Sequence, residues 1–431
     1  MSRKRLVNLL NPGFTKRHVF AWAIYDFANS GYTTVVITAV FNAYFVSVVS
    51  GGAIWGTFLW PCILSLSYVL VIVTGPIIGA YIDISGRRKR VLIITTIGCI
   101  VSTATLSLVG EGDLWKGSIC LILSNYFFGI GENIISSYLP DIAKKEAVGR
   151  ISGFGWAVGY LGGIVTLLVS LIIVLQAQVN GLGAEQYVPM TILITAVVFA
   201  FASIPTFVFL TEGAPRGNQK TTFGESFIRF FQTLRQSRKF KDLYRFLIST
   251  IFFQGGVQAV IALAAIYAQQ VIGFNFTETI ILILVVNITA AIGAWLLGRV
   301  HDSLGHKKSL TLILIGWILV IVMAWFSIER SIFWVTANFV GLLLGACQSN
   351  ARAFVSALTP ESRRAEFFGL WGLAVKSASI LGPVTFGALT WVLDGDHRNS
   401  ILSLVVMFVI GLLFLLTVNV QRGVRAAELE Y

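Results

Sequence analysis

Five ionisable side chains lie inside stretches of sequence that are otherwise apolar, and they are the residues best suited to chemistry. They are Asp26, Glu132, Arg245, Arg352 and Lys376. A charged group is costly to bury among apolar residues, so each should face a partner or a water-filled space. An ammonium at this depth can hold an anion, a carboxylate can bind and release a proton, and an acid facing an arginine can form an ion pair that opens and closes.

Lys376 lies near the middle of its apolar stretch, 366–393. A lysine near the end of such a stretch usually extends its side chain toward the nearest polar interface. The central position of Lys376 makes that route awkward. We therefore expect its ammonium to hold an anionic group of a ligand.

The two acids are candidates for carrying a proton. Burial disfavours the charged form of a carboxyl group, whereas a nearby arginine favours it, so a change of conformation could drive protonation. We predict Glu132 as the proton carrier and Asp26 as the second candidate. In an internal repeat of the chain, Asp26 aligns with Arg245 and Glu132 aligns with Arg352. One or both pairs of an acid with an arginine could close a gate. A permanent structural ion pair is an equal alternative.

The elements that carry these residues have the length and composition of membrane-spanning helices. Hydrophobic residues make up 56% of the 431-residue chain, charged residues 12%, and the mean hydropathy is +0.81. Apolar runs long enough to cross a bilayer recur about twelve times. We place them at 19–47, 58–82, 91–110, 115–139, 150–176, 188–210, 245–271, 278–300, 308–328, 331–357, 366–393 and 399–420.

A repeated turn divides the chain into two related halves. The pattern G-x-x-x-D-x-x-G followed by cations occurs at Gly79–Arg90 and again at Gly298–Lys308, and its aspartates lie 302 − 83 = 219 residues apart. Asp26 aligns with Arg245 at the same distance, and Glu132 with Arg352 at 220 residues. Repeats of this kind build many membrane transport proteins. The sequence therefore predicts an all-α membrane protein with twelve transmembrane helices in two pseudo-symmetric six-helix bundles.

The longest polar stretch separates the two halves. We expect a first bundle at 1–210, a linker at 211–244 and a second bundle at 245–431. Within the linker, Phe223, Phe227, Phe230, Phe231 and Leu234 recur at helical spacing. The remaining surface of that helix is largely occupied by Arg229, Arg235, Arg238 and Lys239. That pattern predicts an amphipathic helix lying along the membrane surface.

Polar stripes run along four equivalent apolar stretches, the first, fourth, seventh and tenth. A single Asn or Gln in such a stretch more often bonds a neighbouring helix, but four stripes in equivalent positions favour one central cavity. From these stripes and from the stretch 366–393 we predict the lining of a binding site. Its residues are Asn29, Tyr32, Asn125, Gln254, Gln258, Trp371 and Lys376.

The formal net charge of +12 reflects topology. Of 32 Lys and Arg residues, 28 lie in the termini, in the loops of one side or at the adjoining helix ends. Cations accumulate on the cytoplasmic side of membrane proteins, so both termini should be cytoplasmic and a nucleic-acid partner is not implied. The first seventeen residues lack the features of a cleavable signal peptide. We expect a multi-pass protein of a plasma membrane.

The sequence lacks the motifs that several other kinds of chemistry require. No nucleophile motif, H-E-x-x-H motif or Walker motif is present, so neither an intramembrane enzyme nor an ATP-driven pump is indicated. The four histidines lie in loops or at the ends of apolar stretches, and the four cysteines are isolated. We therefore expect no catalytic residues, no metal site and no cofactor.

The repeated turn resembles the signature loop of the major facilitator superfamily. In that family the acidic residue of this loop holds the two bundles together on the cytoplasmic side. The resemblance implies that Asp83, Arg87 and Arg90 form such a latch, with Asp302 in the weaker second copy. The second copy has a histidine, His306, where an arginine is usual.

Three further segments are similar to the vacuole-effluxer branch of this superfamily, which is related to the autophagy-linked amino-acid exporter of fungal vacuoles. They are Trp22–Tyr32, Gly153–Gly163 and Ala365–Leu370, the last followed by Lys376 and Gly382-Pro383. The resemblance implies the major facilitator fold and efflux of amino acids or related small metabolites. The short loops are typical of a bacterial member, which would place the protein in the inner membrane as a monomer.

Four functional readings follow. The first is a secondary active transporter that works by alternating access, coupled to protons through Glu132. An uncoupled facilitator and a transporter of siderophore-like or peptide metabolites are the alternatives within the same class. A membrane receptor or scaffold that does not transport is the alternative from another class.

Overall fold

The computed structural model describes residues 10–144, 148–211, 240–360 and 364–428. Twelve helices in this part are long and apolar enough to cross a membrane. Their ends lie within a few residues of the predicted positions. Within a helix the backbone groups away from its ends bond to one another, as the interior of a bilayer requires. The prediction of an all-α membrane protein with twelve membrane-spanning helices is therefore confirmed.

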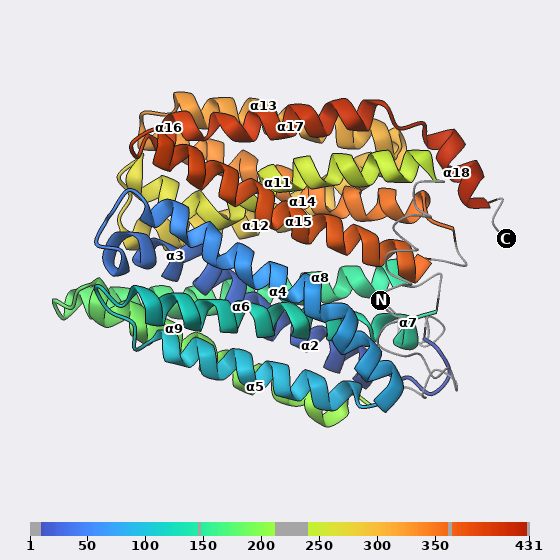
Figure 1. The fold of residues 1–431 in the computed structure, drawn as a ribbon, viewed down its shortest axis with the longest axis horizontal. Helices are drawn as coiled ribbons and strands as arrows, with labels where there is room; N and C mark the ends of the chain where they lie inside the picture. The colour runs from blue at the N-terminus through green and yellow to red at the C-terminus, as the bar shows by residue number, and fades with distance from the viewer. Residues whose placement is uncertain (1–9, 145–147, 212–239, 361–363, 429–431) are drawn as a thin grey trace. The chain divides into compact units, whose positions relative to one another are not determined.

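The described residues form two compact units. Within each unit, Figure 1 shows the long helices running side by side. The first unit holds α2 (Lys16–Tyr32), η1 (Thr33–Ala39), α3 (Phe41–Tyr44), η2 (Phe45–Val49), α5 (Arg88–Leu106), α6 (Leu114–Ser136), α7 (Leu139–Ile142), α8 (Val148–Val179) and α9 (Ala184–Phe209). The second holds α11 (Lys241–Gln270), α12 (Phe276–Leu304), α13 (His306–Phe326), α14 (Arg330–Ala357), α15 (Arg364–Val392), α16 (His397–Ser400), α17 (Leu402–Leu416) and α18 (Val420–Glu428).

One helix, α4 (Gly56–Ser85), contributes to both units. Residues 52–68 group with the second unit, and residues from 69 onward group with the first. The predicted amphipathic linker helix lies in residues 212–239, outside the described part. The division at 211–244 therefore stays a prediction.

Equivalent helices pack together in the two units. In the first unit α2 packs on α8 and α9, and in the second its counterpart α11 packs on α15 and α17. The matching pairs place the two halves of the repeat in the same internal arrangement. The pseudo-symmetry inferred from the turns thus extends to helix packing.

The repeated turn needs its second glycine for a backbone reason. Gly86 directly follows the end of α4 with φ +64°, and Gly305 precedes α13 with φ +79°. Side chains with a Cβ atom rarely adopt these angles, whereas glycine adopts them at little cost. Glycine therefore lets the chain reverse at the same place in both halves.

Glycines also let the central helices approach closely. On α8, Gly155, Gly159 and Gly163 are spaced at one helical turn, and a methyl group built on each would lie within 3 Å of a polar side-chain atom of α2 or η1. On α14, Gly341 and Gly345 lie against the backbone of α12 in the same way. Small side chains at helical spacing are a common basis of close packing between membrane helices.

The first span departs from regular α-helix. After α2 it continues as two π-helical segments, η1 and η2, separated by the four-residue α3. At Val40 the backbone N–H donates to the Val35 carbonyl, five residues back. Wide turns of this kind are frequent at functional sites. The sequence analysis did not predict them.

Candidate functional site

The predicted lining residues of the first unit are buried side chains of α2 and α6. The Tyr32 hydroxyl on α2 lies 2.9 Å from the Ser124 hydroxyl on α6, and the Tyr32 ring stacks on Phe128 at 5.0 Å between centroids. Asn125 is fully buried on α6 next to Ser124. Asn29 is buried on α2, and its Oδ1 atom has no hydrogen-bond partner among the described residues. A buried acceptor of this kind is available to a ligand or to water.

The two predicted proton carriers lie in different surroundings. The Asp26 carboxylate faces the glycine stripe of α8, where a methyl group on Gly155 would lie 2.6 Å from Asp26 Oδ2. Glu132 lies half-buried on α6. The glycine therefore makes room for the carboxylate of Asp26 within a helix–helix contact.

In the second unit, α11 and α14 contact each other through the side-chain amides of two glutamines. Gln254 on α11 and Gln348 on α14 donate to each other, at 3.2 Å from Gln254 Nε2 and 3.4 Å from Gln348 Nε2. Gln254 is fully buried, and Gln258 lies half-buried one turn further along α11. The pair places an uncharged polar group, able to donate and to accept, deep within the unit.

Two half-buried cations of the second unit, Lys376 and Arg352, each lie over an aromatic ring. The Lys376 ammonium on α15 is 5.3 Å from the centre of the Tyr68 ring, in the part of α4 that groups with the second unit. The Arg352 guanidinium on α14 is 5.7 Å from the Trp371 ring on α15. Such contacts stabilise a cation by about 0.5 to 2 kcal/mol. The buried Trp371 Nε1 has no hydrogen-bond partner among the described residues, so it can donate to a ligand.

The first basic turn makes a contact that the sequence analysis missed. Arg88, at the start of α5, donates to the Asp141 carboxylate on α7 at 2.7 Å and to the Ser137 carbonyl at 3.2 Å. The predicted latch residues Arg87 and Arg90 are exposed. The side chains of Asp83 and Asp302 lie outside the described part, so the latch stays a prediction.

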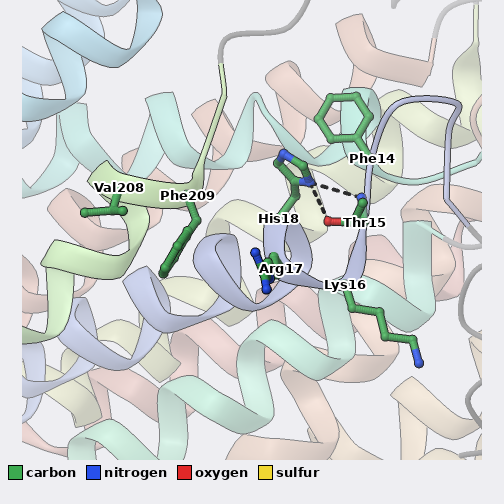
Figure 2. Close-up of a pocket in the computed structure, with 7 residues that line it drawn as sticks. All are labelled: Phe14, Thr15, Lys16, Arg17, His18, Val208 and Phe209. Carbon is green, nitrogen blue, oxygen red and sulfur yellow. Dashed lines mark hydrogen bonds between the residues drawn. The ribbon is translucent and has the colours of Figure 1, made fainter.

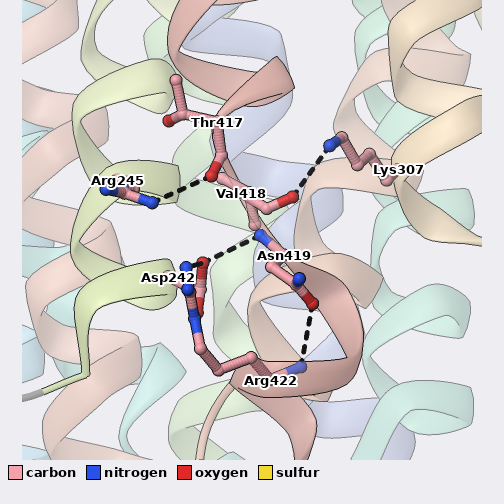
Figure 3. Close-up of polar contacts among 7 residues, drawn as sticks. All are labelled: Asp242, Arg245, Lys307, Thr417, Val418, Asn419 and Arg422. Atoms are coloured by element: carbon pink, nitrogen blue, oxygen red, sulfur yellow. Dashed lines mark hydrogen bonds and ion pairs between the residues drawn. The ribbon is translucent and has the colours of Figure 1, made fainter.

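Arg245, predicted as a gate residue, belongs to a polar cluster at the end of the second unit (Figure 3). Arg245 donates to the Thr417 carbonyl at 3.0 Å, and Lys307 donates to the carbonyls of Leu416 and Val418, both at 2.8 Å. These carbonyls end α17, where the helix carries a partial negative charge that cations neutralise. Arg245 thus has a structural contact within its own unit, and its predicted part in a gate stays untested.

A buried acid completes this cluster. Asp242, in the first turn of α11, accepts two hydrogen bonds from Arg422 of α18, at 2.6 and 2.8 Å. It also accepts one from the Asn419 backbone N–H at 2.8 Å. Gly423 lies against the same aspartate and against Leu358, so a larger residue would require the Leu358 side chain to move. The hydrogen bonds of Asp242, whose partners Asn419 and Arg422 are drawn in Figure 3, hold the C-terminal helix α18 against α11.

The residues that the sequence analysis missed share one property. Tyr68, Arg88, Asp141, Asp242 and Arg422 act through partners far away in the chain. For Asp141 one signal was present, because Pro140-Asp141 recurs as Pro360-Glu361 in the second half. The others have no spacing pattern that would distinguish them.

Comparison with known proteins identifies what the chain resembles. The model of the family described as "Vacuole effluxer Atg22 like" matches residues 57–428. The MFS-type transporter YxiO of Bacillus subtilis is 26% identical over 96% of this chain and 97% of its own length. Autophagy-related protein 22 of Saccharomyces cerevisiae is 21% identical over 85% of this chain and 78% of its own length.

Solved structures share the fold at low sequence identity. A bacterial homologue of the human lysosomal transporter Spinster superposes with a TM-score of 0.71 at 14% identity, covering 97% of this chain and 99% of its own. A D-xylose–proton symporter superposes with a TM-score of 0.69 at 16% identity, covering 93% and 98%. The helices of this chain therefore follow the major facilitator fold.

Proposed function

The chain belongs to the Atg22-like vacuole effluxer family and is a multi-pass membrane transporter of the major facilitator type; from this premise we propose that it carries a small polar metabolite by alternating access. We propose an amino acid or related compound as the substrate, efflux as the direction and coupling to protons. No enzymatic activity is part of this proposal, because the relatives and structural neighbours are transporters.

The observation that carries the substrate proposal is Lys376. Its ammonium lies within an apolar helix and rests on the face of Tyr68. A cation–aromatic contact is weaker than a charge-assisted hydrogen bond to a carboxylate. A substrate carboxylate could therefore attract the ammonium away from the ring. Trp371 Nε1, Asn29 Oδ1 and the Gln254–Gln348 pair would supply further polar groups for recognition.

Replacing Lys376 by alanine should weaken binding of a carboxylate substrate by roughly ten-fold or more, because a charge-assisted hydrogen bond is lost. We would measure thermal stabilisation of the purified protein over a panel of amino acids, peptides and organic acids, then the dissociation constant for each compound that stabilises it. The exposed cation Lys308 provides a matched control, Lys308→Ala. Unchanged affinity in Lys376→Ala would show that the anionic group binds elsewhere.

Proton coupling is proposed through Glu132, with Asp26 as the second candidate. Glu132→Gln removes the titrating group but keeps its size. We expect flux driven by a pH gradient into liposomes to fall to the level of uncoupled exchange, while exchange itself continues. Glu185→Gln, at an exposed acid in the first turn of α9, is the control. Driven flux that survives Glu132→Gln would move the assignment to Asp26.

The gate and the orientation complete the proposal. Asp26 and Glu132 in the first half and Arg245 and Arg352 in the second would supply opposite charges to a gate. In support of this gate, the first copy of the repeat has acids at the positions where the second copy has arginines. We propose that the protein is a monomer of the bacterial inner membrane with both termini in the cytoplasm, because its cations gather at that side and a full-length relative is bacterial.

A further inference from the structure

An open pocket of about 650 Å³ lies in the first unit, apart from the residues proposed to bind substrate. One wall is the segment Phe14–His18, which begins α2, and the other is formed by Val208 and Phe209 at the end of α9. Figure 2 shows the two walls facing each other, with the Arg17 guanidinium between His18 and Phe209. The pocket is therefore shared by two membrane-spanning helices at their ends.

Local bonds fix both walls. The Thr206 hydroxyl of α9 donates to the Ala21 carbonyl of α2 at 2.6 Å, which holds the two helices together beside the pocket. On the other wall the Thr15 backbone N–H donates to His18 Nδ1 at 3.0 Å. The His18 ring also meets Phe14 edge to face at 5.4 Å. The first turn of α2 is thus capped by its own side chain, and its shape does not depend on a ligand.

The charge of the pocket comes from Lys16 and Arg17. Neither makes a hydrogen bond or an ion pair with any part of the chain that the structure describes, and no acidic side chain is among the pocket's described lining residues. In contrast, Arg88, Lys307 and Arg422 each bind a protein acceptor. Lys16 and Arg17 are therefore available to an external anion.

The neighbouring surface is apolar and open. Val208 is 61% exposed, Phe209 45% and Phe20 51%. All three lie on membrane-spanning helices within two turns of an end, where exposed apolar side chains contact acyl chains rather than water. Cations thus adjoin a lipid-facing apolar surface within one pocket. That combination matches an amphiphile, whereas a small soluble anion would use only the cations.

We propose that this pocket binds the headgroup of an anionic phospholipid, with the phosphate at Lys16 and Arg17 and the acyl chains along Val208 and Phe209. Basic pockets at the ends of membrane helices are suited to such headgroups. The bound lipid would join the start of α2 to the end of α9. It would thereby stabilise the first unit in membranes that contain anionic lipid.

The test compares lipid binding in wild-type protein and in the double variant Lys16→Gln/Arg17→Gln. We would count phosphatidylglycerol molecules retained in native mass spectrometry and measure the melting temperature in micelles with phosphatidylglycerol or phosphatidylcholine. We expect phosphatidylglycerol to stabilise the wild-type protein more than phosphatidylcholine. Affinity should fall roughly five-fold for each cation removed. The control Lys308→Gln/Arg425→Gln removes the same charge from exposed positions far along the chain and should retain wild-type binding.

Two further arms address other outcomes. Phe209→Ser should weaken phosphatidylglycerol binding without changing net charge, and inorganic phosphate should give no comparable stabilisation. Equal lipid retention by wild-type protein and the double variant would overturn the proposal. Equal stabilisation by inorganic phosphate would overturn the assignment to a lipid. Because Arg17 is exposed, the single variant Arg17→Gln provides the same comparison if the double variant does not fold.

Discussion

Replacing Gly382 by alanine should destabilise the protein by at least about 3 kcal/mol, the upper end of the usual cost of overpacking a core. A change of this size corresponds to a fall of roughly 6 to 12 °C in the melting temperature of a unit of about 200 residues. The measurement is thermal unfolding of the purified variant in detergent, together with the yield of folded protein from membranes.

The reason is a backbone contact between α15 and α11. A methyl group built at Gly382 overlaps the carbonyl of Gly255, and the nearest atoms are all main chain. A flexible side chain could rotate away from the added methyl, but a carbonyl within a helix cannot. The two helices would have to separate along one of the most extensive contacts of the second unit.

Gly369→Ala is the matched control on the same helix. Gly369 is exposed, and a methyl group built there meets no atom within 4 Å. Alanine favours helix over glycine by up to about 1 kcal/mol, so this variant should be neutral or slightly stabilised. If Gly382→Ala were as stable as Gly369→Ala, the close approach of α11 and α15 would be wrong.

Asp242→Asn should release the C-terminal helix from the second unit and cost about 2 to 3 kcal/mol. Asp242 is 3% exposed and accepts three hydrogen bonds, two of them from Arg422. Its contribution is below that of a fully buried pair because the Arg422 side chain is 55% exposed and partly screened by water. The hydrogen bonds to the Asp242 carboxylate also raise the pKa of the Arg422 guanidinium, so Arg422 stays in its charged form.

Limited proteolysis and thermal unfolding would measure this effect. Asp242→Asn should expose the segment after Leu416 to protease, and Arg422→Gln should give a similar pattern. The double variant should cost little more than either single change, because both remove one interaction. Arg425→Gln, at an exposed position on the same helix, should behave as wild type. Equal protease resistance in Asp242→Asn and wild type would contradict a clamped helix.

The sequence predicted the membrane-spanning helices well because each depends on local composition. A run of about 20 apolar residues must form a helix in a bilayer, whatever its neighbours are. The repeated turn was equally informative, since Gly86 and Gly305 need a left-handed backbone that depends only on the local chain reversal.

The candidate site was less accessible to prediction because its contacts join distant segments. Lys376 was identifiable from its depth in an apolar stretch, but nothing in the sequence pointed to Tyr68 as the ring beneath it. Asp26 was likewise identifiable as an acid within an apolar stretch, but nothing in the sequence pointed to Gly155 of α8 as the residue against its carboxylate. A helical stripe shows which residues share a face, and only packing decides which neighbour that face meets.

The wide turns of the first span affect how the two halves are compared. Each π-helical turn accommodates one more residue than an α-helical turn, so residues beyond it are rotated and displaced relative to an uninterrupted helix. The counterpart α11 is α-helical throughout, whereas the span from Lys16 to Val49 contains η1 and η2. The offset of 219 residues therefore equates positions before Thr33, including Asp26 with Arg245, but gives no structural equivalence further along the span. A chimaera that exchanges segments between the two halves would therefore keep the register of the helix only if the junction lay before Thr33.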